Sequence, residues 1–219
     1  LVTGPTGSGK TTTLYAMLQA LDREKNNVVS LEDPIEYSIP GINQSQVWPE
    51  INYTFANGLR SILRQDPDII MVGEIRDSET AKLAVQAALT GHLVLSTLHT
   101  NNAAGVIPRL LDMGVDPYLI AATLVLAIAQ RLVPLLCEES KEAVPLEGSI
   151  RAMVDQIIEG APELLKNKTD RPAHIYRAQT SPTCPAGTRG RLAVFEMFEL
   201  DKDFDNLLLS HPTEDAVYN

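Results

Sequence analysis

A glycine-rich turn lies between a short apolar segment and a helical segment at the beginning of this 219-residue chain. The turn reads GPTGSGKT from Gly4 to Thr11, after the segment Leu1–Thr3 and before a helical pattern that continues to about Leu21. Glycines in such a turn let backbone N–H groups point at a phosphate, because no Cβ stands in the way. The N-terminal end of the following helix carries partial positive charge and faces the same anion. Strand, turn and helix in this order predict a nucleoside triphosphate site.

Individual residues of the turn have separate expected tasks. Lys10 is expected to reach the β- and γ-phosphates, and the Thr11 hydroxyl is expected to bind Mg²⁺. The other residues expected to contact the nucleotide are Gly4, Thr6, Gly7, Ser8, Gly9 and Thr12. A chance match to the pattern has a probability on the order of one in a hundred for a chain of this length. The nucleotide interpretation is therefore preferred over an ordinary glycine-rich turn.

Acidic residues follow two further predicted strands. The strand Val28–Leu31 is followed by the acids Glu32, Asp33 and Glu36. The strand Ile69–Val72 is followed by Gly73 and Glu74, an order that resembles a Walker B element with Glu74 near Mg²⁺. In doubly wound sheets, ligands bind beyond the carboxyl ends of the strands. Acids placed there are expected to hold Mg²⁺ through water or to orient and deprotonate the attacking water, the alternative being ordinary solvated turn residues.

Histidines flank a third predicted strand, Leu93–Leu98. His99 follows it, in a polar cluster with Thr100 and Asn101, and this position favours a sensor of the γ-phosphate over a structural histidine. His92 precedes the strand and follows a predicted helix stop, so it is either a second sensor or a turn residue.

Helical patterns alternate with these strands. Thr54 reads as the N-cap of a helix with an apolar stripe that ends at Leu63, and Ser78–Leu89 reads as another helix. Arg60 and Arg64 lie four residues apart on one face of the first helix, where they either contact phosphate across a subunit boundary or pair with surface acids. Alternating strands and helices predict an α/β fold with a parallel sheet.

Composition limits the classes of function. The net charge of −10 and the aromatic content of 5% disfavour a surface that binds nucleic acid. The longest apolar run, Leu119–Ala129, is shorter than the roughly 20 residues that span a bilayer. Two cysteines, Cys137 and Cys184, are too few for a disulfide framework and point to a reducing compartment. Because the chain starts at Leu1 inside a predicted strand, we expect it to be a fragment that lacks its N-terminal part.

Four ordered segments resemble the secretion ATPase superfamily, and within it the motors of type II secretion and of type IV pilus extension. Those segments are the phosphate loop GPTGSGKTTT, LEDPIEY as its Asp box, LRSILRQDPDIIMVGEIRD as its Walker B segment and TGHLVLSTLHTNNA as its His box. RLLDMGVDPYLIAATLVLAIAQRL also resembles the extension-type motors rather than the retraction motors. The similarity covers residues 1–136 and resumes at Gly190–Glu196.

The resemblance implies a fold and a division into domains. Residues 1–136 would be a RecA-like ATPase core with a parallel-dominated sheet flanked by helices, without its N-terminal strands and N-terminal domain. Residues 137–219 would be a small C-terminal α/β subdomain, with a helical insert around Ile150–Leu165 and then a strand and a helix. Many members bind zinc there through two Cys-x-x-Cys pairs. With only Cys137 and Cys184 present, no zinc is expected, and packing is expected to hold this subdomain together.

Residue roles also follow from the resemblance. Glu36 would be the catalytic glutamate that polarises water, Glu74 the Walker B acid near Mg²⁺, and His99 the His-box sensor. The residues that would shape or complete this site are Glu32, Asp33 and Arg76, the last as a partner of acids or phosphate.

The resemblance further implies a homo-hexamer that hydrolyses ATP with Mg²⁺, each site completed by a neighbour or by the N-terminal domain. It would act in the cytoplasm at the inner face of the membrane, bound peripherally through platform and adaptor proteins, and would not bind nucleic acid. Three alternatives remain: a RecA-like nucleic-acid motor, a small-molecule kinase, and a nucleotide-binding subunit that has lost catalysis.

Overall fold

The computed structural model describes residues 1–160, 172–200, 208 and 216–217, and it divides into two compact units. The first unit comprises Leu1–Leu132 and Ala193–Asn219, and the second comprises Val133–Leu192. The expected boundary between residues 136 and 137 therefore differs from the structure, as does the expectation that the second domain continues to residue 219. The reason is that β6 (Leu126–Leu136) and β9 (Thr188–Glu199) both pass from one unit to the other.

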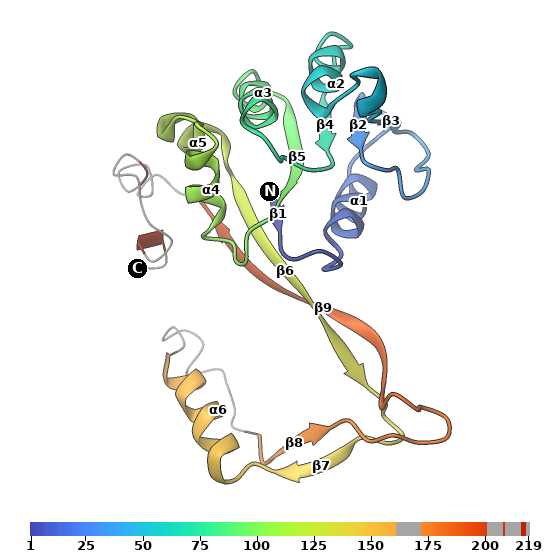
Figure 1. Cartoon of the computed structure of the whole chain (residues 1–219), viewed down its shortest axis with the longest axis vertical. Helices are drawn as coiled ribbons and strands as arrows, with labels where there is room; N and C mark the ends of the chain where they lie inside the picture. Colours follow the sequence, from blue (N-terminus) through green and yellow to red (C-terminus); the bar gives the residue numbers. More distant parts are fainter. Residues whose placement is uncertain (161–171, 201–207, 209–215, 218–219) are drawn as a thin grey trace. The chain divides into compact units, whose positions relative to one another are not determined.

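The first unit contains a seven-stranded sheet with the order β3-β2-β4-β5-β1-β6-β9 (Figure 1). Its other strands are β1 Val2–Thr3, β2 Val28–Glu32, β3 Asn43–Gln46, β4 Ile69–Val72 and β5 Leu93–Leu98. The helices among its described residues are α1 Lys10–Ala20, the short 3-10 helix Pro49–Ile51, α2 Phe55–Ile62, α3 Ser78–Leu89, α4 Val106–Asp112 and α5 Pro117–Thr123. The pairs β1–β5, β1–β6, β2–β3, β2–β4 and β4–β5 are all parallel, which confirms the expected α/β class with a parallel-dominated sheet.

The central strands β2 and β4 are buried on both faces of the sheet. Successive side chains of a strand point to opposite faces, so each of these strands contributes to the packing on both sides. Along β4, Ile70 and Val72 belong to a cluster that also holds apolar residues of α2, α3, α4 and α5. Ile69 and Met71 belong to a second cluster, together with residues of α1. All four residues of β4 are buried, as expected for a central parallel strand. The carboxyl ends of these strands are thereby fixed along one edge of the sheet.

Local signals place the helices where the sequence predicts them. The side chain of Thr54 caps α2 by accepting the N–H of Asn57 at 3.3 Å. Asp77 caps α3 by accepting the N–H of Thr80 at 2.8 Å. The apolar run Leu119–Ala129 is divided between the end of α5 and the start of β6. Within the described residues, no helix is both long and apolar enough to cross a bilayer.

The second unit has a small sheet of its own and one described helix. β7 (Glu142–Pro145) pairs antiparallel with β8 (His174–Arg177). The predicted helical insert is α6 (Gly148–Gly160), and the last five residues of its expected range lie outside the described residues. The helix expected after the last strand also falls mostly outside them.

Candidate nucleotide site

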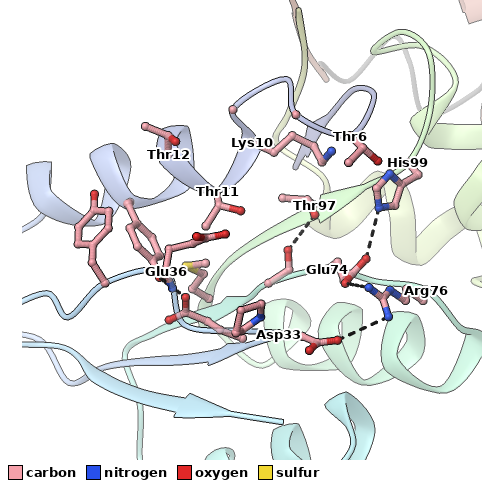
Figure 2. A pocket seen from close by; sticks show the side chains of 18 of the residues that line it. Thr6, Lys10, Thr11, Thr12, Asp33, Glu36, Glu74, Arg76, Thr97 and His99 are labelled. Atoms are coloured by element: carbon pink, nitrogen blue, oxygen red, sulfur yellow. Dashed lines mark hydrogen bonds and ion pairs between the residues drawn. The ribbon is translucent and has the colours of Figure 1, made fainter.

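A cavity of about 670 Å³ lies where the strands β2, β4 and β5 end, beside the start of α1 (Figure 2). Thr6, Lys10, Thr11 and Thr12 line it from the turn and from α1. Other side chains come from the segments after the strands: Asp33, Glu36, Glu74, Arg76 and His99. The turn and the acids that the sequence singles out therefore share one cavity.

The turn has the backbone conformation that its glycines predict. Gly7 and Gly9 adopt positive φ values of 76° and 87°, which side chains with a Cβ rarely adopt. Both line the cavity, whereas Gly4 and Ser8 do not. Gly4 instead packs against the backbone of Gln130, since a Cβ at Gly4 would lie 2.4 Å from the Gln130 carbonyl oxygen.

Lys10 is held within the turn. Its Nζ donates to the carbonyl oxygens of Gly4 and Pro5 at 2.9 and 3.1 Å. Partial burial lowers the pKa of Lys10 from its usual value, and the nearby Glu74 carboxylate acts in the opposite direction. The ammonium group therefore lies at the cavity, within the electrostatic reach of the acid that follows β4.

Glu74 is the centre of a chain of polar and charged side chains. Its Oε1 accepts from Arg76, and its Oε2 lies 3.3 Å from Nε2 of His99. Arg76 also reaches Asp33, with 3.6 Å between Nη1 and Oδ2 (Figure 2). The hydrogen bond with Glu74 raises the pKa of Arg76. Only 12% of the Glu74 side chain is exposed, so its interactions are weakly screened by solvent.

Threonines fix the strand ends that carry these groups. Thr97 in β5 donates from Oγ1 to the carbonyl oxygen of Gly73 at 2.8 Å, directly before Glu74. The N–H of Thr100 donates to Oγ1 of Thr3 at 2.8 Å, directly after His99. These contacts hold Glu74 and His99 at one edge of the sheet.

Glu32 and Glu36 occupy different environments. Glu32 is 2% exposed and accepts hydrogen bonds from Tyr15, Ser30 and Gln44, so it belongs to the buried frame of the cavity. The side chain of Glu36 is exposed and lines the cavity. Sequence reasoning missed Tyr15, although its position four residues after Thr11 on α1 places both on one helical face.

Three residues singled out from the sequence lie outside the cavity lining. Arg60 forms an ion pair with Glu79 and a hydrogen bond with Asn57. Arg64 is exposed in the turn after α2, so the expectation that both arginines lie on one face of that helix is wrong, because the helix ends at Ile62. Within this chain, Arg60 thus follows the surface-pairing interpretation.

Nδ1 of His92 lies 2.8 Å from the carbonyl oxygen of Ala87 at the end of α3. Because His92 precedes β5 and His99 follows it, they lie at opposite edges of the sheet, and His92 fits the interpretation as a turn residue.

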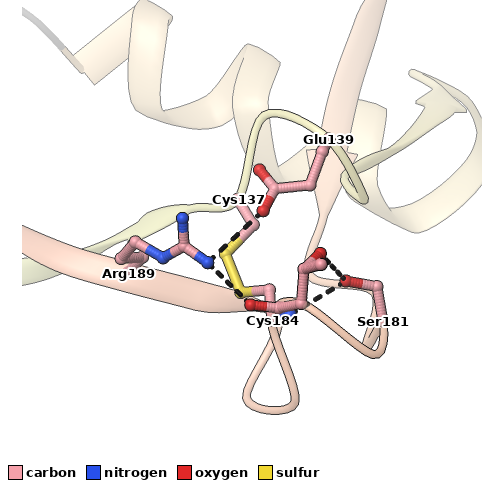
Figure 3. Close-up of a disulfide and its surroundings, with 6 residues drawn as sticks. Cys137, Glu139, Ser181, Cys184 and Arg189 are labelled. Atoms are coloured by element: carbon pink, nitrogen blue, oxygen red, sulfur yellow. Dashed lines mark hydrogen bonds and ion pairs between the residues drawn. A yellow bond between two sulfur atoms is a disulfide. The ribbon is translucent and has the colours of Figure 1, made fainter.

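The two cysteines form a disulfide, which corrects the expectation that packing alone holds the second unit (Figure 3). Cys137 follows β6 and Cys184 precedes β9, and each is 3% exposed. Around the bond, Arg189 pairs with Glu139 and donates to the carbonyl oxygen of Thr183.

The described residues contain no group of three or more His, Cys, Asp or Glu side chains placed to hold a metal ion.

Known proteins resemble this chain along its length. The sequence model of a family described as type II/IV secretion system protein matches residues 1–219. Type II secretion system ATPase E of Vibrio cholerae is 50% identical, covering 99% of this chain and 41% of that protein. Type II secretion system protein E of Pseudomonas aeruginosa is 48% identical, with the same two coverages. The chain thus spans about two fifths of the length of these curated relatives.

Solved structures show the same fold. The pilus retraction motor PilT, with bound ADP, matches with a TM-score of 0.65 and 31% identity over 95% of this chain and 49% of that one. The ATPase DotB of Legionella pneumophila matches with a TM-score of 0.62 and 28% identity over 99% and 48%. These likenesses confirm the expected RecA-like class of fold and the resemblance to secretion ATPases. Since the family's sequence model covers every residue, this chain belongs to the type II/IV secretion system protein family.

Proposed function

We propose that this chain is the nucleotide-binding part of an ATP-hydrolysing motor that drives assembly in type II secretion or in type IV pilus formation. The observation that carries the proposal is that the phosphate-binding turn, Glu36 and Glu74 line one cavity. The names of the relatives support it, since one is a type II secretion ATPase and another a pilus retraction motor with ADP. No feature of the cavity favours a nucleic-acid motor.

The charges of the cavity suit a triphosphate. Lys10 would exchange its contacts with Gly4 and Pro5 for phosphate oxygens, and the N–H groups of the turn would bind the same anion. His99, at the rim beside Glu74, would respond to the terminal phosphate. Arg76, which bridges Glu74 and Asp33, would keep those carboxylates in place or move to a phosphate.

Magnesium fits these residues. Mg²⁺ takes oxygen ligands and usually keeps several waters, so one or two protein oxygens together with phosphate oxygens suffice. The Thr11 hydroxyl and the Glu74 carboxylate line the same cavity and would supply them, Glu74 partly through water. When bound, the ion neutralises charge on the phosphates. Glu36 would orient the attacking water and accept its proton, because its carboxylate faces the cavity and is free of the buried frame that holds Glu32.

The assembled motor is part of the same proposal. A homo-hexamer, recruited to the cytoplasmic face of the inner membrane by platform and adaptor proteins, would use turnover at each site to drive subunit loading. The family and the named relatives support a role in a secretion machine.

The test compares two variants of the protein at its natural length. Lys10→Ala should abolish tight ADP binding, whereas Glu36→Gln should bind ADP normally and hydrolyse ATP roughly 10²–10⁴-fold more slowly, because it lacks the general base. Chelation of Mg²⁺ should stop turnover of the unaltered protein. Glu50→Gln, at an exposed acid outside the cavity lining, is the matched control and should leave the rate unchanged. An unaltered protein without ATP turnover would contradict the proposal, and a fully active Glu36→Gln would contradict the role of Glu36.

A further inference from the structure

A buried tyrosine lies between the helix that begins at the phosphate-binding turn and the segment that carries Glu36. Tyr15 is 0% exposed among the apolar residues of α1, yet part of it lines the nucleotide cavity. It follows Thr11 by four residues, so both side chains leave α1 on the same face. The helical face that turns Thr11 to the cavity therefore also turns Tyr15 toward the residues after β2.

The hydroxyl of Tyr15 has three hydrogen-bond partners. It donates its hydrogen to Oε2 of Glu32, and it accepts the backbone N–H of Glu36 at 3.3 Å and Nε2 of Gln44 at 3.5 Å. A phenolic hydroxyl has one hydrogen to donate and lone pairs to accept with, so these bonds are compatible. Burial, followed by the hydrogen bond to Glu32, raises the pKa of Tyr15 to about 12. The hydroxyl consequently keeps its hydrogen at neutral pH.

Glu32 provides a fixed anchor for this hydroxyl. Its other oxygen, Oε1, accepts from Ser30 within β2 and from Nε2 of Gln44 in β3, the latter at 3.0 Å. A buried carboxylate is costly unless it is hydrogen-bonded, so the three donors are needed to keep Glu32 inside the protein. The oxygen of Tyr15 is thus tied to two strands of the sheet as well as to α1.

The segment after β2 is held around the same point. The ring of Tyr37 packs edge-on against the ring of Tyr15, with 4.8 Å between centroids. Gln44 donates to the carbonyl oxygen of Tyr37 at 3.2 Å and accepts the N–H of Ile39 at 2.7 Å. The Glu36 side chain itself is exposed to the cavity, so the place of its carboxylate depends on where this backbone is held.

We infer that Tyr15 is a positioning residue for the hydrolytic step: its hydroxyl fixes the backbone of Glu36 relative to α1, which carries Lys10 and Thr11. This inference rests on the function proposed above. The triphosphate would be bound by the start of α1 and the attacking water by Glu36, so Tyr15 would set the distance between the two reacting groups. A displacement of about 1 Å at such a site can cost roughly 100-fold in rate.

The test is Tyr15→Phe in the protein at its natural length. This change removes one oxygen and retains the ring that packs on Tyr37. We expect kcat for ATP to fall roughly tenfold to a hundredfold, because Glu36 loses its backbone anchor. The dissociation constant for ADP should stay within about twofold, because the phosphate-binding turn is unchanged.

Tyr53→Phe is the matched control. Tyr53 is partly buried in the same unit, and its hydroxyl lies 2.9 Å from Oγ of Ser45, outside the cavity lining. It should also lose one hydrogen bond and keep the kcat of the unaltered protein. A Tyr15→Phe variant with unaltered kcat, or one whose loss is matched by Tyr53→Phe, would overturn the inference while leaving the ATPase function intact. Failure of the unaltered protein to hydrolyse ATP would instead overturn the function itself.

Discussion

Single residues in the phosphate-binding turn depend on space as well as on backbone conformation. Gly4 and Gly7 both have positive φ, at 139° and 76°, but their surroundings differ. A Cβ at Gly4 would lie 2.4 Å from the carbonyl oxygen of Gln130 in β6, whereas a Cβ at Gly7 would have nothing within 4 Å. Gly4 therefore allows the turn to pack closely against the sheet, whereas Gly7 is needed only for the backbone conformation of the turn.

Gly4→Ala should consequently be more harmful than Gly7→Ala. We expect Gly4→Ala to lower the free energy of unfolding by roughly 3 kcal/mol or more, because backbone strain and overlap with a main-chain atom add together. Gly7→Ala should cost about 1–2 kcal/mol from backbone strain alone. Denaturant unfolding of both variants checks this. Equal losses would show that the contact with Gln130 does not limit residue 4.

Among the elements, α2 and β2 pack closely enough to affect the site, although neither binds phosphate. Gly58 of α2 faces Leu31 of β2, and a Cβ there would lie 2.7 Å from both Leu31 methyl carbons. Leu31 is fully buried and directly precedes Glu32. The close approach of this helix therefore supports the strand whose end carries the acids of the cavity.

Gly58→Ala is expected to destabilise the protein in spite of the better helix propensity of alanine. Alanine gains about 1 kcal/mol in a helix, but overpacking against Leu31 costs roughly 1–3 kcal/mol. The net loss should appear as a lower melting temperature. Gly160→Ala, in a helix where an added Cβ meets nothing within 4 Å, is the matched control and should be neutral or slightly stabilising. A more stable Gly58→Ala would show that Leu31 moves aside freely.

On the scale of the whole molecule, the two compact units are held by different means. The first has hydrophobic clusters on both faces of its sheet. The second contains α6 without a buried residue, and its small sheet has two described strands. Its cross-link joins Cys137 to Cys184 across 47 residues of sequence. Since the described residues of this unit provide so little core, it is the part of the protein that depends most on a covalent bond.

Reduction should destabilise the second unit and leave nucleotide binding unaltered. Closing a loop of this size stabilises a fold by about 2–4 kcal/mol, chiefly by restricting the unfolded chain. A reductant should therefore lower the melting temperature of this unit, while ADP affinity stays the same because the nucleotide cavity belongs to the first unit. The variant with both Cys137→Ala and Cys184→Ala should have the melting temperature of the reduced protein, and a reductant should not change it. Two titratable thiols in the denatured, unreduced protein would contradict the disulfide.

Features that depend on neighbouring residues can be predicted from the amino-acid order alone. The glycine pattern of the phosphate-binding turn, the apolar run of β4 and the cap Thr54 act through local sterics and hydrogen bonds, so their positions can be predicted from the chain. The parallel sheet and the placing of Glu74 at a strand end follow from the alternation of helices and strands. The family resemblance selected Glu36 among the nearby acids.

Contacts between groups that are distant in the chain depend on how the whole first unit or second unit folds. Tyr15 and Glu36 are 21 residues apart, and Cys137 and Cys184 are 47 apart. Whether such pairs touch depends on how helices pack on the sheet and on where β9 returns, and these are set by the burial of apolar surface over the whole unit. Arg60 and His92 show the converse, since their residue types suit phosphate binding but packing directs them to Glu79 and to the end of α3. The spacing of two residues in the sequence carries little information on such contacts, because they depend on the packing of the whole unit and not on nearby residues.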